Sequence, residues 1–124
     1  MVQAILLVMA GGAVGSAIRY LISHFFSELS QHHGFPIGTL LVNVIGSFAV
    51  GYILTWSNDH GNDRWRLLMA TGFCGGFTTF STFAYESMAY WQNSRFLMLA
   101  LNVSINNMLS FCAVMLGIQM HKPG

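Results

Sequence analysis

The segment from Gly72 to Glu86 combines side chains that can bind ions with a backbone poorly suited to a helix. It lies in a hydrophobic run long enough to cross a bilayer, yet it contains three glycines and four Ser or Thr hydroxyls. A glycine inside a helix costs about 1 kcal/mol relative to alanine, and Gly75 and Gly76 followed by Thr78 and Thr79 favour a departure from helical geometry. Non-helical backbone at membrane depth is tolerated only where it is buried in protein or lines a wet cavity. The segment therefore predicts a broken helix with a site at the break.

This segment offers two kinds of ion site. The hydroxyls can donate to an anion, and the edge of a phenyl ring carries partial positive charge, so the candidate anion ligands are Thr79, Phe80, Ser81, Thr82 and Phe83. Backbone carbonyls released by a break suit a monovalent cation instead. The spacing of the phenylalanines alone favours ordinary packing. The residues by themselves do not choose between the two ions.

Polar residues recur on the two neighbouring hydrophobic segments. Asn102, Asn106 and Ser110 are spaced by four residues and share one helix face. They form either a polar track for a solute or hydrogen bonds between helices, each worth about 0.6 to 2 kcal/mol, and their alignment favours the track. Asn43, with Thr39 one turn before it, is open to both interpretations.

Two charged residues fall within or near hydrophobic segments, where an ionisable side chain is costly and is a functional candidate. Glu86 is either a proton carrier or an acceptor for backbone groups released by the break. Arg19 either draws anions into a vestibule or extends to the lipid headgroups. We expect both residues to lie at the edges of the site.

Composition places the chain in a membrane. Of its 124 residues, 54% are hydrophobic and 7% are charged, against roughly a quarter charged in soluble domains. The net charge of +1, without a basic cluster, argues against a nucleic-acid partner. We interpret both cysteines, Cys74 and Cys112, as small buried apolar residues.

Four segments are long and apolar enough to span a bilayer, and we predict an all-α fold with helices over residues 2–26, 36–56, 65–91 and 96–120. The third helix is expected to be broken near its middle. The connections are too short for a soluble domain, so residues 1–124 are expected to form a single four-helix transmembrane domain.

The basic residues give almost no orientation bias. Arg64, Arg66 and Lys122 lie on one side of the predicted membrane, and Arg19 and Arg95 on the other. The protein is therefore expected to insert both ways round. Four spans make a poor pore alone, and a Gly11–Gly15 pair in the first span permits close helix packing, so we predict an antiparallel homodimer.

Three motifs together resemble the Fluc fluoride channels, also called the CrcB family, across essentially the whole chain. They are Gly11 to Gly15 leading to Arg19-Tyr20, Gly38 to Asn43 with Gly46-Ser47-Phe48, and Gly72 to Phe83. The resemblance implies a non-enzymatic, multi-pass protein of the bacterial inner membrane. It implies a dual-topology homodimer with two pores that passively export fluoride from the cytoplasm and relieve its toxicity.

The resemblance also implies residue roles. A structural sodium ion at the dimer centre would be bound by backbone carbonyls of Gly75 and Thr78. The other matched positions belong to the fluoride pore or support it: Arg19, Thr39, Asn43, Thr79, Phe80, Ser81, Thr82, Phe83, Glu86, Asn102, Asn106 and Ser110. Asn102 and Asn106 depart from the residues that the family usually has in the fourth helix, Tyr and Ser.

The alternative is a small proton-coupled transporter of organic cations or drugs, a class that is also short, four-spanning and dual-topology. Such a transporter requires an acid in the middle of the first span, and residues 2–18 contain none. Glu86 is the only candidate proton carrier. A structural assembly subunit is a third alternative, but it does not explain polar residues aligned on three spans.

Overall fold

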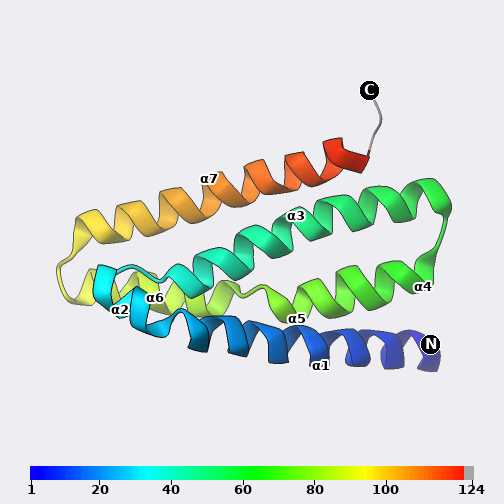
Figure 1. Cartoon of the computed structure of the whole chain (residues 1–124), viewed down its shortest axis with the longest axis horizontal. Coiled ribbons are helices and arrows are strands. Elements are labelled where there is room, and N and C mark those ends of the chain that lie inside the picture. Colours follow the sequence, from blue (N-terminus) through cyan, green and yellow to red (C-terminus); the bar gives the residue numbers. More distant parts are fainter. Residues whose placement is uncertain (122–124) are drawn as a thin grey trace.

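The structure, a computed structural model, describes residues 1–121, which form helices joined by short connections, with no strand in that part. Lys122, one of the three basic residues on one side of the predicted membrane, lies outside the described residues. The spans are α1 (Val2–Phe25), α3 (Ile37–His60), a third composite span (Asp63–Gln92) and α7 (Phe96–His121). All four are long and apolar enough to cross a membrane, which confirms a multi-pass, all-helical membrane protein. The start of α1 and the end of α7 lie at the same end of the molecule (Figure 1).

The third span is assembled from four pieces. They are α4 (Asp63–Trp65), the π-helix η1 (Arg66–Cys74), α5 (Gly75–Phe77) and α6 (Phe80–Gln92). The sequence predicted an interruption in this span and not the wider turns of η1. A π-helix pairs each N–H with the carbonyl five residues earlier, and such segments are frequent at functional sites.

The connection after α1 contains a short helix that the sequence analysis treated as a loop. This helix, α2 (Ser27–His33), ends at Gly34, whose φ of 68° is left-handed and suits a residue without a Cβ. The hydroxyl of Ser30 accepts from the Ile37 N–H at 3.1 Å and ties α2 to the start of α3. The result is a fixed corner between the first two spans.

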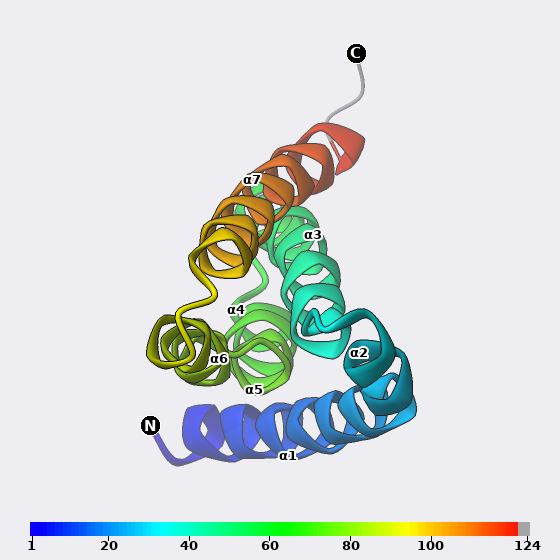
Figure 2. The same ribbon diagram turned by 90° about the vertical axis from the view of Figure 1, so that its left-hand side faces the viewer.

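Glycines bring α3 and α7 into backbone contact, and these two helices run side by side (Figure 2). A Cβ on Gly51 would overlap the Val114 carbonyl oxygen, and one on Gly117 would overlap the Phe48 carbonyl oxygen. Without a hydrophobic driving force between helices in lipid, close van der Waals packing of this kind holds spans together.

The first span packs in the same way on η1 and α5 (Figure 2). A Cβ on Gly76 would lie 2.6 Å from the Gly12 carbonyl oxygen, and one on Gly72 would lie 2.8 Å from the Val8 carbonyl oxygen. Gly11 and Gly15 face η1 and α5 with equally little room, so the predicted close approach is used inside the subunit. The glycine pair therefore no longer supports a dimer.

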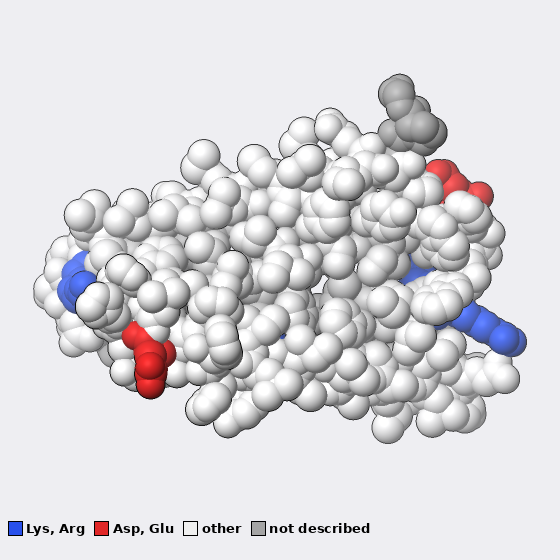
Figure 3. Space-filling view, in the orientation of Figure 1, with Lys and Arg blue, Asp and Glu red and all other residues white. Residues whose placement is uncertain are grey.

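The face of the molecule seen in Figure 3 has charged ends and an apolar middle. Lys, Arg, Asp and Glu atoms gather at the two ends of the molecule, and almost none are visible between them (Figure 3). This distribution is the one expected of a molecule whose middle lies in hydrocarbon. Cys74 is buried as expected, but Cys112 is exposed on α7, so the prediction of two buried cysteines is wrong for Cys112.

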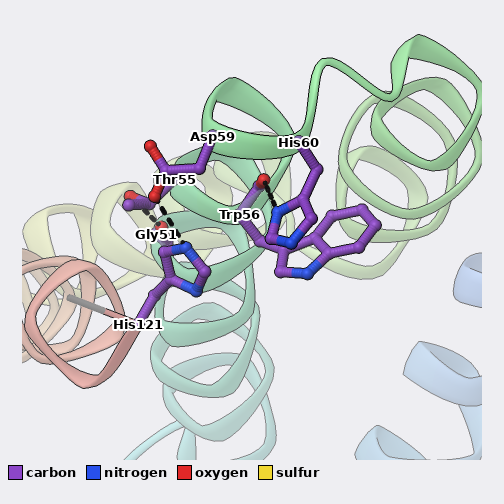
Figure 4. Close-up of polar contacts among 6 residues, drawn as sticks. All are labelled: Gly51, Thr55, Trp56, Asp59, His60 and His121. Atoms are coloured by element: carbon purple, nitrogen blue, oxygen red, sulfur yellow. Dashed lines mark hydrogen bonds and ion pairs between the residues drawn. The ribbon is translucent and has the colours of Figure 1, made fainter. Parts of the chain in front are cut away.

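One charged end is organised around the last turns of α3 and α7 (Figure 4). The His121 Nε2 lies 2.9 Å from Asp59 Oδ2, and the His60 ring stacks on Trp56 with its Nδ1 2.9 Å from the Trp56 carbonyl oxygen. Among residues 1–121, no group of three or more His, Cys, Asp or Glu side chains is arranged to hold a metal ion. The His121–Asp59 contact joins the ends of α7 and α3, whereas the His60–Trp56 contact lies within the last turn of α3.

Candidate functional site

The break in the third span falls at Thr78 and Thr79, which are extended (φ −84°, ψ 158° and φ −148°, ψ 119°). The interruption was predicted within this segment, but the glycines do not form it. Gly75 has helical angles (φ −62°, ψ −39°), and Gly76 is required by the close approach of α1. The two threonines are the residues that leave helical geometry.

The amide of Asn43, on α3, replaces the helical partners of Thr79. Asn43 Oδ1 accepts from the Thr79 N–H at 2.9 Å, and Asn43 Nδ2 donates to the Thr79 carbonyl oxygen at 3.2 Å. In a continuous α-helix the Thr79 N–H would donate to the Gly75 carbonyl. The side chain from α3 therefore holds the break open and releases that carbonyl.

The Thr79 hydroxyl caps the N-terminus of α6. Its Oγ1 accepts from the Thr82 N–H at 3.2 Å, as an N-cap residue does, and donates to the Thr82 hydroxyl oxygen at 3.1 Å. In a continuous helix the Thr82 N–H would donate to the Thr78 carbonyl. Gly75 and Thr78, the two predicted cation ligands, are thus residues whose carbonyls lose their helical donors at the break. A set of released carbonyls is the chemistry that binds sodium in broken membrane helices.

Arg19 takes a position that neither of our two interpretations included. Its Nε donates to the Gly76 carbonyl oxygen at 3.1 Å, and Ser16 Oγ lies 3.5 Å from the same oxygen. The guanidinium of arginine has only N–H donors, so it can satisfy a carbonyl oxygen that has lost its helical donor. The side chain therefore caps α5 from α1.

Arg19→Gln is expected to destabilise the protein by about 1 to 3 kcal/mol. Glutamine is neutral and shorter than arginine, so the Gly76 carbonyl loses its charged donor. The measurement is thermal unfolding of the purified protein in detergent. Arg64→Gln, at the exposed start of the third span, is the matched control and is expected to change stability by less than about 0.5 kcal/mol. Equal effects of the two substitutions would show that the Gly76 contact is not stabilising.

A cavity of about 300 Å³ lies beside the break, between α3 and α7. It is lined by polar side chains and by the two phenylalanines of the motif: Asn43, Gly46, Ser47, Val50, Thr78, Thr79, Phe80, Phe83, Asn106, Asn107, Ser110 and Val114. The rings of Phe80 and Phe83 have centroids 5.7 Å apart, and Phe80 is 77% exposed in the single chain. The cavity therefore combines amide and hydroxyl donors with aromatic edges and is open on one side.

The structure gathers six of the predicted pore residues at this cavity: Asn43, Thr79, Phe80, Phe83, Asn106 and Ser110. Sequence reasoning missed Ser47 and Asn107, although Ser47 lies one turn after Asn43 on the same helix face. Asn102 is fully buried and does not line the cavity. Ser81 and Thr82 lie in the first turn of α6 and do not line it either.

Thr39 and Glu86 lie nearer one end of the molecule, where the Thr39 hydroxyl donates to Glu86 Oε2 at 3.1 Å. Glu86 lines a second cavity of about 320 Å³ together with Tyr90 and Arg95. The Arg95 guanidinium lies 5.5 Å from the centre of the Tyr90 ring, and the Tyr90 hydroxyl donates to the Gly34 carbonyl at 2.7 Å. Glu86 is therefore separate from the central cavity and lies beside Arg95, which was not predicted as a site residue.

Comparison with known proteins identifies the family to which the chain belongs. Residues 6–118 match the family model described as "CrcB-like protein, Camphor Resistance (CrcB)". The chain is 45% identical over 107 residues to the Koribacter versatilis protein named "Fluoride-specific ion channel FluC", with 85% of this chain and 84% of that protein covered. It is 44% identical over 113 residues to proteins of the same name from Salmonella arizonae and Salmonella paratyphi B, covering 90% of this chain and 87% of each relative. The predicted resemblance is confirmed, and the chain belongs to the CrcB family.

Proposed function

We propose that the chain is a subunit of a fluoride-selective channel through which fluoride leaves the cytoplasm of a bacterium passively, relieving fluoride toxicity. The observation that carries the proposal is the central cavity, where amide and hydroxyl donors from α3 and α7 face the Phe80 and Phe83 rings. Fluoride holds its water strongly, and a pore must replace that shell with close donors. Larger halides gain less from the same donors. The relatives' name supports this assignment, which makes the protein a channel of the inner membrane and not an enzyme.

The functional unit in this proposal is an antiparallel homodimer. The central cavity is open, and the Phe80 ring on its rim is 77% exposed. A second copy inserted in the opposite orientation would close the cavity, and the nearly balanced basic residues permit both orientations. Two cavities per dimer would give two pores.

A structural sodium ion at the dimer centre is part of the proposal. Gly75 and Thr78 would hold it through the carbonyls whose helical donors have been taken by Asn43 and Thr79. The ion would supply positive charge to this oxygen cluster. Gly75 is exposed in the single chain, as a residue shared between two subunits would be.

The test is efflux from fluoride-loaded proteoliposomes, followed with a fluoride electrode. Wild-type protein is expected to release fluoride rapidly and chloride slowly, and Phe80→Ile to reduce fluoride efflux more than about tenfold, because the ring edge is lost from the cavity. Phe25→Ile, at the end of α1 with its ring 80% exposed, is the matched control and is expected to behave as wild type. Equal fluoride and chloride efflux from wild-type protein contradicts the proposed selectivity.

A further inference from the structure

A chain of hydrogen bonds between side chains, three of which are buried, connects the third span to α7 and α3 and returns to the third span. Ser87 Oγ donates to the Phe83 carbonyl at 2.9 Å, and Asn102 Nδ2 donates to Ser87 Oγ at 3.0 Å. Asn106 Nδ2 donates to Asn102 Oδ1 at 2.9 Å and to the Asn102 carbonyl at 3.1 Å. Asn43 Nδ2 then donates to Asn106 Oδ1 at 3.4 Å, and Asn43 Oδ1 accepts from the Thr79 N–H. The chain therefore begins at the Phe83 carbonyl and ends at the N–H of Thr79, the residue before Phe80.

The direction of every bond in this chain is fixed by its two ends. The Thr79 N–H can only donate, so the Asn43 atom facing it is the oxygen, and the Asn43 NH₂ must donate onward. At the other end the Phe83 carbonyl can only accept, so the Ser87 hydroxyl donates to it and accepts from Asn102. Asn106 lies between and has one consistent orientation, with its oxygen toward Asn43 and its NH₂ toward Asn102.

Because these side chains are buried, the assignment of donor and acceptor at each hydrogen bond leaves no alternative. Asn102 is 0% exposed, Asn106 4% and Ser87 6%, so water cannot replace a missing partner at these side chains. The bonds made by the Asn43 NH₂ are the longest of the chain, at 3.2 Å to the Thr79 carbonyl and 3.4 Å to Asn106. Those hydrogens are the ones most weakly held by the protein, and Asn43 and Asn106 are the hydrogen-bonding side chains of this chain that also line the central cavity.

We propose that Asn102 and Ser87 are positioning residues: through Asn106 they keep the Asn43 NH₂ directed as a donor at the cavity without contacting the ion themselves. Without the Asn102 amide, the Asn106 side chain loses one of its two acceptors and can turn its NH₂ toward that of Asn43. Two donors would then face each other, and Asn43 would be displaced from Thr79. This role replaces the pore-lining role expected of Asn102, and it rests on the proposed use of the cavity as the fluoride path.

The test is the fluoride concentration dependence of efflux for Asn102→Leu, Asn106→Leu and the double variant. Asn102→Leu is expected to raise the half-saturating fluoride concentration about fivefold to tenfold, with a smaller change in the maximal rate. In the Asn106→Leu background the same change is expected to have less than about a twofold effect, because the connection to Asn43 is already cut. Ser104→Leu, at an exposed position on the same helix, is the matched control.

A residue that lined the path independently would add its effect to that of Asn106→Leu, and additive effects therefore overturn the proposal. A half-saturating concentration unchanged by Asn102→Leu overturns it as well. Where Asn102→Leu does not fold, Ser87→Ala removes the far end of the chain and is expected to raise the half-saturating concentration about threefold, with an unchanged value overturning the proposal. Wild-type protein that releases no fluoride refutes the channel function itself, whereas normal wild-type efflux with an unchanged Asn102→Leu curve refutes the positioning role alone.

Discussion

Gly11→Ala is expected to lower the free energy of unfolding by about 3 kcal/mol or more, one of the largest effects of a single methyl group in this protein. The added Cβ would overlap the Leu68 carbonyl oxygen and lie 2.7 Å from the Phe73 backbone nitrogen. Both obstacles are backbone atoms of η1, which cannot move aside as a flexible side chain would. The first span must therefore separate from the third. Thermal unfolding in detergent is expected to show a midpoint lower by about 10 °C.

The neighbouring glycine provides a matched control. A Cβ on Gly12 would meet only the Gly72 carbonyl oxygen, at 3.7 Å, which is ordinary contact. Gly12→Ala is thus expected to be neutral or to stabilise the helix by up to about 1 kcal/mol. Similar unfolding midpoints for the two variants would show that α1 is not held against η1 by backbone contact.

Asn43→Leu is expected to reduce fluoride efflux more than about 100-fold while the protein still inserts in the membrane. Leucine has a similar size but no polar atom, so the Thr79 N–H and carbonyl and the Asn106 oxygen lose their partner together. A buried group that loses its partner costs about 1 to 3 kcal/mol, and Asn106 is only 4% exposed. The break is then expected to close or shift, which moves the Phe80 ring and removes a donor from the cavity. The electrode assay in proteoliposomes measures the loss.

Asn93→Leu is the control for this substitution. Asn93 is exposed at the end of α6, and its amide donates only to the Ala89 carbonyl of the preceding turn, at 3.0 Å. Its replacement is expected to change efflux less than about twofold. Efflux by Asn43→Leu within about threefold of wild type would falsify the role assigned to the Asn43 amide.

Hydrophobic length and helix-breaking residues were enough to predict the four spans. The predicted second span ended at residue 56, but α3 continues to His60, because the Asp59–His121 and His60–Trp56 contacts extend the helix by a turn. The helix α2 was missed because its sequence is polar, and polar residues between spans are also typical of a loop. The π-helical turns of η1 depend on the fit to α1, which no local pattern contains.

The central site was predicted in part, and the errors have a physical origin. Spacing by four placed Asn102, Asn106 and Ser110 on one face of α7. Residues on one helix face can still point in different directions, and Asn102 is buried in the protein and not at the cavity. The glycines and the threonines of the segment were predicted to break the helix together, whereas Gly76 is small to admit α1 and only the threonines leave helical geometry. Arg19 could not be assigned to the Gly76 carbonyl because the two are 57 residues apart in sequence.

The bonds across the break also constrain the order in which the spans can settle in the bilayer during synthesis. Backbone groups at Gly76 and Thr79 would be expensive to expose to lipid, so the third span needs its partners when it leaves the translocation machinery. Two of them, Arg19 and Asn43, lie earlier in the chain and are synthesised first. Asn106 is synthesised last and adds its hydrogen bond to Asn43 after the first two spans have already satisfied the backbone groups at the break. A nascent chain that ends before α7 therefore already contains the side chains that satisfy its break.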